Sequence, residues 1–392
     1  MSEIPLPLGF RAAGLWAGIK KPNRGFDLGL LAADRPVDAA AMFTTNALVG
    51  AHVAVCREQL AASGGLVRAV IVNAGCANCA TGERGLDDAR ETARLVALRL
   101  GCRPQEVLPI STGAIGAHLP MPKLRDAIPT LVDALREDGA EDFARAIMTT
   151  DTHRKLESAT FCADDGEARV TGFSKGAGMI HPNMATMLGF LTTDAVLPRA
   201  AMPLLREVVE RSYHRVTVDG DTSPNDTVVL LASGRRRVAD GELCEGALLD
   251  VAGRLCRQIA RDGEGATRLV TVQVRGAVDD AQASTAARTI ATSPLVKTAI
   301  AGRDPNWGRI LSAAGRAGVA IDVAHAKVWV GETFVFDEGR PFPEREPLAA
   351  AHLAKEEEVV IGVDLASGEA GVDVWTCDFT ADYVRINAEY RT

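Results

Sequence analysis

The sequence predicts a mixed α/β protein in which β-sheets lie between layers of helices. Short runs rich in Val and Ile alternate with segments whose apolar residues recur every three or four positions, and this favours α/β over the all-α and all-β classes. The chain has 392 residues, 47% hydrophobic and 24% charged, which is typical of a globular protein of two or three domains. Only 5% of the residues are aromatic, so we expect cores of Ala, Val, Leu and Ile.

The clearest predicted elements come early in the chain. Leu66–Asn73 is a strand candidate, and a turn containing Gly, Asn and Cys follows it. The helix predicted after this turn ends before Gly101, a residue type that commonly terminates helices. Its apolar positions are Leu86, Ala89, Ala93, Val96 and Leu100. Val107–Ile110 is the next strand candidate, and it leads into the Gly-rich turn Ser111–Gly116.

The middle and the end of the chain continue the alternation. Strands at 156–162 and 168–173 flank Asp164-Asp165-Gly166, a hairpin signal. Two long helices are predicted at about 198–214 and 242–262. Further strands are expected at 227–232, 268–274, 327–330, 359–363 and 371–377. The polar stretch 277–287 is the best candidate for a boundary between lobes, because no Pro/Ser-rich linker divides the chain.

The charge pattern and the hydropathy pattern exclude several classes of partner. Lys and Arg number 43 against 51 Asp and Glu, which gives a formal net charge of −8, and no basic stripe appears. Nucleic acid is therefore not an expected partner. No apolar stretch reaches the ~20 residues that a bilayer span requires, so we expect no membrane association. The first residues lack the features of a secretory signal, and we expect a cytoplasmic protein with mostly reduced cysteines.

Motif searches give mainly negative results. The sequence lacks a P-loop, a strand-embedded G-x-G-x-x-G, a G-x-S-x-G and an H-E-x-x-H. Cys76-Ala77-Asn78-Cys79 is a C-x-x-C, but it has no second ligand pair for zinc, and we expect no metal. We interpret these two thiols as incidental, with a redox or metal-binding protein as the alternative.

The most distinctive segment runs from Lys175 to Phe190, KGAGMIHPNMATMLGF. A Gly-rich loop closed by Pro182, followed by a buried strand or helix, explains its glycines and methionines. This interpretation does not explain why the Gly- and Pro-containing loop is followed by a hydroxyl residue, Thr186, among apolar residues.

This segment resembles the self-cleavage segment of the ornithine acetyltransferase family, also called glutamate N-acetyltransferase. In that family the chain cuts itself between the Ala and the Thr, which are Ala185 and Thr186 here. The resemblance covers essentially the whole chain. Further matches are GF (9–10), AGIK (17–20), FTTN (43–46), STGAIG (111–116), IMTTDT (147–152), DGDTS (219–223), DGEGA (262–266), LVKTA (295–299), DPNWGR (304–309) and DYVRIN (382–387).

The resemblance implies a fold, a reaction and a set of site residues. The fold is of the N-terminal-nucleophile type, a sandwich of mixed sheets between helix layers with a smaller C-terminal α/β lobe. Thr186 is the nucleophile, and Thr112 with Gly113 forms the oxyanion hole. The substrate contacts carried over are Thr149 (or its neighbour Thr150), Lys175, Thr186, Glu264, Asn387 and Thr392. Lys175 suits a carboxylate and Glu264 suits an ammonium group.

The implied reaction follows from the chemistry of an N-terminal threonine. Cleavage frees an α-amine with a pKa of about 7.7–8.0, which can act as the base for the adjacent hydroxyl. The hydroxyl then takes acetyl from N2-acetyl-L-ornithine and passes it to L-glutamate in a ping-pong cycle. The resemblance also implies fragments 1–185 and 186–392, assembled as a heterotetramer of two copies of each. No cofactor is implied, but some members accept acetyl-CoA as a co-substrate, and the sequence leaves this open.

Two departures from the family pattern and three alternatives remain. Cys76 and Cys79 stand in a turn where the family usually has Asn and Ala, and Pro224 stands where Thr is common. These differences affect the predicted substrate preference more than the reaction type.

The alternatives are an N-terminal-nucleophile amidase or aminopeptidase that transfers the acyl group to water, a secondary-metabolism acetyltransferase of the same family, and a non-enzymatic thiol or metal-binding protein. Asp304–Arg309 we interpret as a structural corner.

Overall fold

The computed structural model describes residues 4–181 and 187–389. Those residues form two compact units, and each is described by itself. The first unit holds residues up to 214 together with 221–255, and the second holds 215–220 and the residues from 256 onward. The boundary between the two units at residue 255 falls within a helix. The polar stretch 277–287, suggested above as a boundary, instead joins a strand to a helix inside the second unit.

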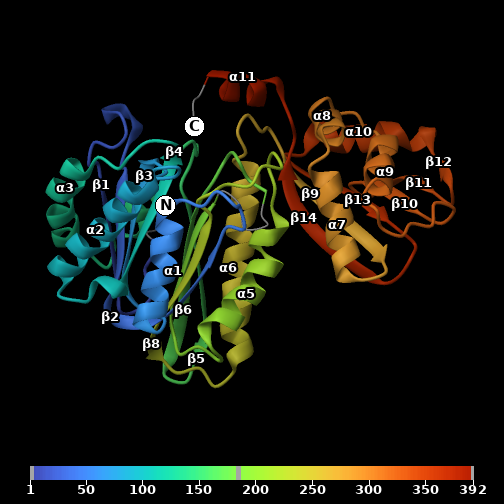
Figure 1. The fold of residues 1–392 in the computed structure, drawn as a ribbon. Coiled ribbons are helices and arrows are strands. Elements are labelled where there is room, and N and C mark those ends of the chain that lie inside the picture. Colours follow the sequence, from blue (N-terminus) through green and yellow to red (C-terminus); the bar gives the residue numbers. More distant parts are fainter. Residues whose placement is uncertain (1–3, 182–186, 390–392) are drawn as a thin grey trace. The chain divides into compact units, whose positions relative to one another are not determined.

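The first unit contains most of the elements predicted for the first two thirds of the sequence (Figure 1). Its strands are β1 (Phe10–Leu15), β2 (Leu28–Phe43), β3 (Leu66–Cys76), β4 (Val107–Ala114), β5 (Lys155–Ala163), β6 (Gly166–Lys175), β7 (Leu188–Ala195) and β8 (Thr227–Arg236). Its helices are α1 (Ala51–Ser63), α2 (Gly82–Leu100), α3 (Met121–Asp133), α4 (Ala140–Ala146), α5 (Ala201–Arg211) and the larger part of α6 (Gly241–Arg261), with 3₁₀ turns at Pro22–Arg24, Pro104–Glu106 and Tyr213–Arg215.

Within the described residues, the strands of this unit form one hydrogen-bonded sheet in the order β4-β3-β2-β8-β7-β6-β5, with β1 paired to β2. The pairs β3·β4 and β7·β8 are parallel, and the other pairs are antiparallel. The hairpin predicted around Gly166 is confirmed as β5 and β6.

The sheet folds back on itself at β2. In a flat sheet, β4 and β8 would lie three strand spacings apart, about 14 Å. The side chain of Asn225, which precedes β8 by two residues, nevertheless donates a hydrogen bond to the carbonyl of Ser111 in β4 at 2.8 Å. The register of β2 against β3 breaks between Ala32 and Val37, and β2 pairs with β8 beyond this irregularity, from Asp38 on. The two halves enclose a shared core that includes Val70, Phe190 and other buried side chains of β1–β4 and β6–β8.

Helices cover the outer faces of the folded sheet. Helices α2 and α3 lie beside β1 and β3, and α5 and α6 lie on the opposite side (Figure 1). The buried positions of α2, including Ala89, Ala93 and Val96, recur every three to four residues, as predicted. The helix ends at Gly101, whose left-handed backbone (φ +66°) suits glycine. The predicted layers of sheet between helices are therefore confirmed.

The second unit is a smaller α/β lobe, as expected. It contains β9 (Leu269–Ala277), β10 (Lys327–Val330), β11 (Thr333–Asp337), β12 (Arg340–Pro341), β13 (Glu358–Asp364) and β14 (Ala370–Cys377). Its helices are α7 (Asp280–Ala291), α8 (Pro294–Ala301), α9 (Trp307–Gly315), α10 (Glu346–Lys355) and α11 (Ala381–Glu389), with a 3₁₀ turn at Pro343–Arg345. The strand order among described residues is β12-β11-β10-β13-β9-β14.

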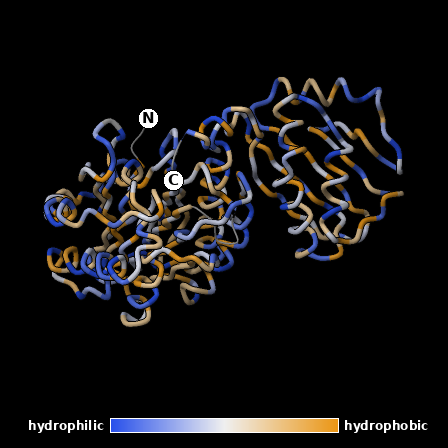
Figure 2. Tube along the Cα trace, turned by 45° about the horizontal axis from the view of Figure 1, so that its top comes forward, coloured by the Kyte–Doolittle hydropathy of each residue, from blue (hydrophilic) through white to orange (hydrophobic). Residues whose placement is uncertain are grey.

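The core of the second unit lies between its sheet and α7, α9 and α10. Asn306 caps α9, because its side chain accepts a hydrogen bond from the Arg309 N–H at 3.1 Å, and Trp307 stacks on Phe336 with ring centroids 5.0 Å apart. The interpretation of Asp304–Arg309 as a structural corner is therefore confirmed. In both units hydrophobic and hydrophilic positions alternate along the trace, and hydrophilic positions are frequent at the periphery (Figure 2). None of the helices in the described ranges combines the length and apolar character needed to cross a membrane.

Candidate active site

The loop between β6 and β7 carries the predicted cleavage site. Ala185 and Thr186 lie outside the described residues, as does Thr392. The described ends of this loop are fixed by the sheet, since Lys175 and Leu188 are register partners. Leu188 in turn pairs with Thr227 at the start of β8. The loop therefore leaves the end of β6 and enters the adjacent start of β7, beside the start of β8.

Asn225 and Asp226, two consecutive buried residues, join this loop to the predicted oxyanion turn. The Asn225 side chain donates hydrogen bonds to the carbonyls of Ala77 at 2.6 Å and Ser111 at 2.8 Å. Asp226 accepts a hydrogen bond from the Met187 N–H at 3.0 Å. Ser111 precedes Thr112, and Met187 follows Thr186 in the sequence. The Asn225-Asp226 pair therefore brings the Thr112–Gly113 turn to the loop that contains the predicted nucleophile.

Gly113 allows the end of β4 to approach β3 closely. Its backbone has φ +132°, and a Cβ at this position would collide with the backbone of Gly75 and Cys76. Gly75 also has a positive φ, +113°. The preceding Thr112 is buried, with 3% of its surface exposed. Only glycine fits where the two strand ends meet, and the residue type at 113 is thus explained by packing as well as by the predicted catalytic role.

Lys175 and Thr149 lie together, as predicted, and Asp151 organises them. The Lys175 ammonium donates a hydrogen bond to the Thr149 hydroxyl at 3.3 Å. The Asp151 carboxylate accepts hydrogen bonds from the Lys155 ammonium at 2.6 Å, the Gly176 N–H at 2.6 Å and the Thr149 N–H at 2.9 Å. Burial alone would raise the pKa of Asp151, but the Lys155 and Lys175 cations outweigh it and hold this pKa well below its ordinary value. Asp151 is therefore a carboxylate that fixes both ends of the Lys175–Thr149 pair.

A cavity of about 720 Å³ opens beside Thr149. The cations Lys20, Arg24, Arg145 and Arg154 line it, and Glu141 pairs with the last two at 2.9 and 2.5 Å. Burial lowers the pKa of Lys20 to about 8, although Asp27 and Asp151 act in the opposite direction. A cavity with this excess of cations suits an anionic ligand.

In the second unit, the predicted residues Glu264 and Asn387 contact each other. The Asn387 amide donates a hydrogen bond to a Glu264 carboxylate oxygen at 2.9 Å. Two further contacts hold α11 against the loop that carries Glu264. The Thr380 hydroxyl donates to the Gly265 carbonyl at 2.6 Å, and a Cβ on Gly265 would collide with the backbone of Tyr383.

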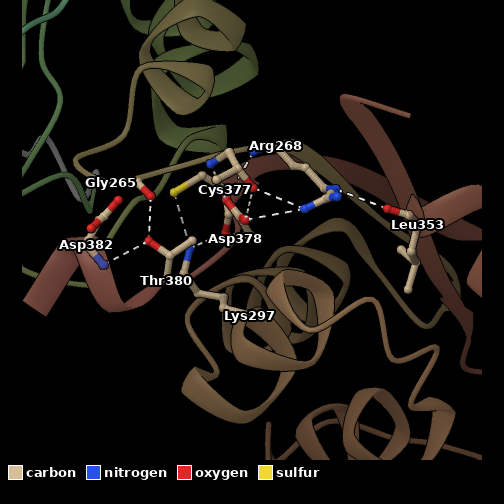
Figure 3. Close-up of polar contacts among 9 residues, drawn as sticks. Gly265, Arg268, Lys297, Leu353, Cys377, Asp378, Thr380 and Asp382 are labelled. Carbon is tan, nitrogen blue, oxygen red and sulfur yellow. Dashed lines mark hydrogen bonds and ion pairs between the residues drawn. The ribbon is translucent and has the colours of Figure 1, made fainter. Parts of the chain in front are cut away.

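The buried carboxylate of Asp378 holds the other end of the same loop (Figure 3). It accepts hydrogen bonds from the Thr267 N–H at 2.8 Å, the Thr267 hydroxyl at 2.5 Å and the Arg268 N–H at 3.1 Å. The Arg268 guanidinium lies 3.8 Å from Asp378 and donates to the Leu353 carbonyl at 3.1 Å. Figure 3 also shows Lys297, which is buried and donates to the Cys377 carbonyl at the end of β14. These contacts fix the loop after α6 to the end of the sheet.

The structure thus assembles four of the sequence-predicted residues, Thr112, Gly113, Thr149 and Lys175, around one loop of the first unit. It assembles Glu264 and Asn387 separately, within the second unit. Sequence reasoning did not single out Asn225, Asp226, Asp151 or Lys155. The run Asp219–Asp226 was interpreted only as a loop supporting the pocket. A signal was present in the polar pair Asn225-Asp226 directly before the apolar run Val228–Ala232.

The two departures from the family pattern also lie in this part of the first unit. Cys76 and Cys79 are buried free thiols, and burial raises the pKa of both, whereas a redox pair needs a lowered pKa. The Pro224 carbonyl accepts a hydrogen bond from the Gly50 N–H at 2.9 Å. In the part of the chain that the structure describes, no group of three or more His, Cys, Asp or Glu side chains is arranged to hold a metal ion.

Comparisons with known proteins agree over nearly the whole chain. A model of the ArgJ family matches residues 11–392. The arginine biosynthesis bifunctional protein ArgJ of Thermus thermophilus is 47% identical over 395 residues, covering 99% of this chain and 100% of that protein. The protein of the same name from a Synechocystis species is 44% identical over 406 residues, covering 100% of this chain and 98% of that protein. A crystal structure of the arginine biosynthesis bifunctional protein ArgJ from Bacillus halodurans is 40% identical, covers 51% of this chain and 98% of that chain, and gives a TM-score of 0.49.

Proposed function

The chain belongs to the ArgJ family, and we propose that it is an acyltransferase of arginine biosynthesis. It transfers acetyl from N2-acetyl-L-ornithine to L-glutamate through an acetyl ester on Thr186. The observation that carries this proposal is the Asn225-Asp226 pair, which joins the Thr112–Gly113 turn to Met187. A nucleophile and its oxyanion donors have to lie within one site, and this pair supports that arrangement.

The proposed cycle begins with self-cleavage. The Thr186 hydroxyl attacks the Ala185 carbonyl, the peptide bond breaks, and water hydrolyses the resulting ester. The new Thr186 α-amine then accepts the hydroxyl proton as the oxygen attacks the acetyl group of N2-acetylornithine. Ornithine leaves with a proton on its α-amine. The α-amine of glutamate then attacks the acetyl ester and regenerates the free hydroxyl.

The remaining residues suit the two substrates. The Lys175 ammonium, held beside the Thr149 hydroxyl, is a partner for a substrate carboxylate. The Glu264 carboxylate, oriented by Asn387, is a partner for the side-chain ammonium of the donor. We include Thr392 in the substrate site on the family resemblance. The mechanism needs no cofactor, because the nucleophile, its base and the oxyanion donors all belong to the chain.

The assembly and the second donor are part of the proposal. Self-cleavage gives an alpha chain of residues 1–185 and a beta chain of residues 186–392, and two of each form a heterotetramer in the cytoplasm. We also propose acetyl-CoA as a second acetyl donor. The cavity beside Thr149 supports this, because four cations line it and its volume of about 720 Å³ suits a ligand of nucleotide size.

The test uses the nucleophile and the products. The variant Thr186→Ala is expected to stay a single chain without acetyl transfer, and Thr186→Ser, which keeps a hydroxyl, is expected to cut and turn over. Wild-type protein with N2-acetylornithine and glutamate is expected to yield N-acetylglutamate and ornithine. Release of free acetate regardless of glutamate would instead indicate an amidase. Failure to use either amino acid would indicate an acetyltransferase of secondary metabolism.

A further inference from the structure

Asp226 contacts Met187, the first described residue after the proposed cleavage bond. One of its carboxyl oxygens, Oδ1, accepts the Met187 N–H at 3.0 Å, and the residue is 1% exposed. Met187 follows Thr186 in the sequence, and consecutive Cα atoms of any chain are only about 3.8 Å apart. Its neighbour Asn225 holds the Thr112 turn, so the carboxyl lies between the proposed oxyanion donors and the loop that is cut.

The second carboxyl oxygen of Asp226, Oδ2, is buried, and among the residues that the structure describes none donates a hydrogen bond to it. Buried polar atoms are nearly always paired, and an unpaired one at a functional site points to a chemical role. Burial raises the pKa of the Asp226 carboxyl well above its ordinary value, although the Lys175 cation, the Met187 N–H and the Thr44 hydroxyl oppose this rise. A raised pKa makes the carboxylate a stronger base toward a hydroxyl proton, and a carboxyl that has taken such a proton can pass it on.

Self-cleavage needs such a group. After the cut, Thr186 carries its own base, but before the cut its nitrogen is a peptide nitrogen with no basicity to offer. We infer that the Asp226 carboxyl is the proton-transfer group of self-cleavage. This inference rests on the proposed function, and it concerns the precursor rather than the acetyl-transfer cycle.

The step balances without any other reactant. The bond between the Thr186 Oγ and the Ala185 carbonyl carbon forms, and the bond between that carbon and the Thr186 nitrogen breaks. The Asp226 carboxylate takes the proton of the attacking hydroxyl, and the resulting carboxyl gives it to the departing nitrogen. The net change moves one proton from oxygen to nitrogen, and water then hydrolyses the ester.

The experiment measures the cutting rate of newly synthesised precursor by following the two fragments over time. Asp226→Asn preserves shape and an oxygen acceptor for the Met187 N–H but cannot transfer a proton. We expect it to cut at least about 100-fold more slowly than wild type, the lower range for loss of general acid–base catalysis. Asp194→Asn is the matched control, because Asp194 is also buried and accepts the N–H groups of Leu8 and Arg169 at 3.0 and 2.8 Å. It is expected to cut at the wild-type rate.

Two further readouts separate proton transfer from folding. Asp226→Glu keeps a titratable carboxyl and is expected to recover part of the lost rate, with melting temperatures confirming that both variants fold. Hydroxylamine cleaves esters directly, so it is expected not to rescue Asp226→Asn, in which the ester does not form. Rescue by hydroxylamine, equal rates for the Asn and Glu variants, or wild-type cutting by Asp226→Asn would each overturn the inference. If wild type itself stays uncut, the proposed function fails instead.

Discussion

Lys20 shows how a single buried side chain acquires an unusual charge state. Its ammonium donates hydrogen bonds to the carbonyls of Phe26 at 2.5 Å and Met148 at 2.8 Å. Burial lowers its pKa to about 8. A neutral amine still has two N–H donors, so both hydrogen bonds survive deprotonation. The folded state therefore tolerates the neutral form, which the unfolded chain reaches only near pH 10.5.

The lowered pKa of Lys20 makes the free energy of unfolding depend on pH. Between pH 8 and pH 10.5 the unfolded chain binds more protons at this site than the folded protein does, so the Lys20 contribution to stability rises with pH across that window. In protein that carries ¹³C-labelled lysine, we expect the Cε resonance of Lys20 to titrate by NMR with a midpoint near 8. An exposed lysine titrates near 10.4. A Lys20 signal that does not move through pH 8 would contradict this account.

Gly113 provides a second test at the scale of one residue. Gly113→Ala places a Cβ against the Gly75 backbone and forces an L side chain into φ +132°. We expect it to lower the free energy of unfolding by at least about 2 kcal/mol and to impair cutting. Gly116→Ala is the control, since Gly116 also has a positive φ (+83°) but nothing lies within 4 Å of its Cβ position. Urea unfolding of the two variants measures the difference, and equal losses would show that crowding at Gly113 is unimportant.

The residues that the sequence predicted and those that it missed differ in a physical way. Thr112, Gly113 and Lys175 belong to Gly-rich segments whose pattern is specific. Asp151 and Asp226 look like ordinary loop carboxylates, because the contacts that tie each of them to the loop between β6 and β7 come from residues remote in sequence. Asp151 accepts a hydrogen bond from Gly176, and Asp226 accepts one from Met187. Such roles exist only once the strands have paired, and no local pattern encodes them.

The loop that carries Glu264 depends on the element that follows β14. Asp378 holds the Thr267 and Arg268 N–H groups, and Thr380 holds the Gly265 carbonyl. Asp378→Asn leaves Arg268 without its buried anion, and removing one partner of such a pair is costly. We expect the variant to lose about 1–3 kcal/mol of stability. Its KM for N2-acetylornithine should also rise while kcat changes little.

The control for this experiment lies on β14, the strand that ends directly before Asp378. Asp373 pairs with Arg275 at 2.6 Å, but both side chains are at least 36% exposed. A pair exposed to solvent contributes little, so Asp373→Asn is expected to leave stability and KM nearly unchanged. Steady-state kinetics and thermal unfolding measure both effects. If Asp378→Asn folds and its KM is unchanged, Asp378 does not position Glu264 for substrate binding.

Helices and strands whose apolar residues recur at a regular spacing could be predicted from the sequence, and those with an interrupted pattern could not. The strand β3 and the helix α2 show uninterrupted patterns of buried residues. The strand β2 was not predicted, because exposed Asp34 and Arg35 and the following Pro36 interrupt its apolar run at the bend. The helix α1 buries the polar side chains of His52 and Gln59, which hides its apolar face. The helix α11 has no buried residues, so burial leaves no pattern to detect.

At the scale of the whole molecule, the proposed cut divides one sheet and one core. Strand β7, in the beta chain, pairs with β6 in the alpha chain, and β8 pairs with β2. Leu188, Phe190 and Val229 share a core with Val70 and Ile110. Neither fragment can bury its apolar residues alone, so the two should stay associated after cleavage. The boundary between the compact units, at residue 255, is a separate division that composition does not reveal.

The most direct test is the intact mass of the natively purified protein, followed by N-terminal sequencing of its components. We predict two fragments that elute together under native conditions and separate only in denaturant. Their masses should correspond to residues 1–185 and 186–392, and the second should begin Thr-Met-Leu-Gly. A single uncut chain of 392 residues, or fragments cut at another bond, would contradict the assignment of Thr186 as the nucleophile.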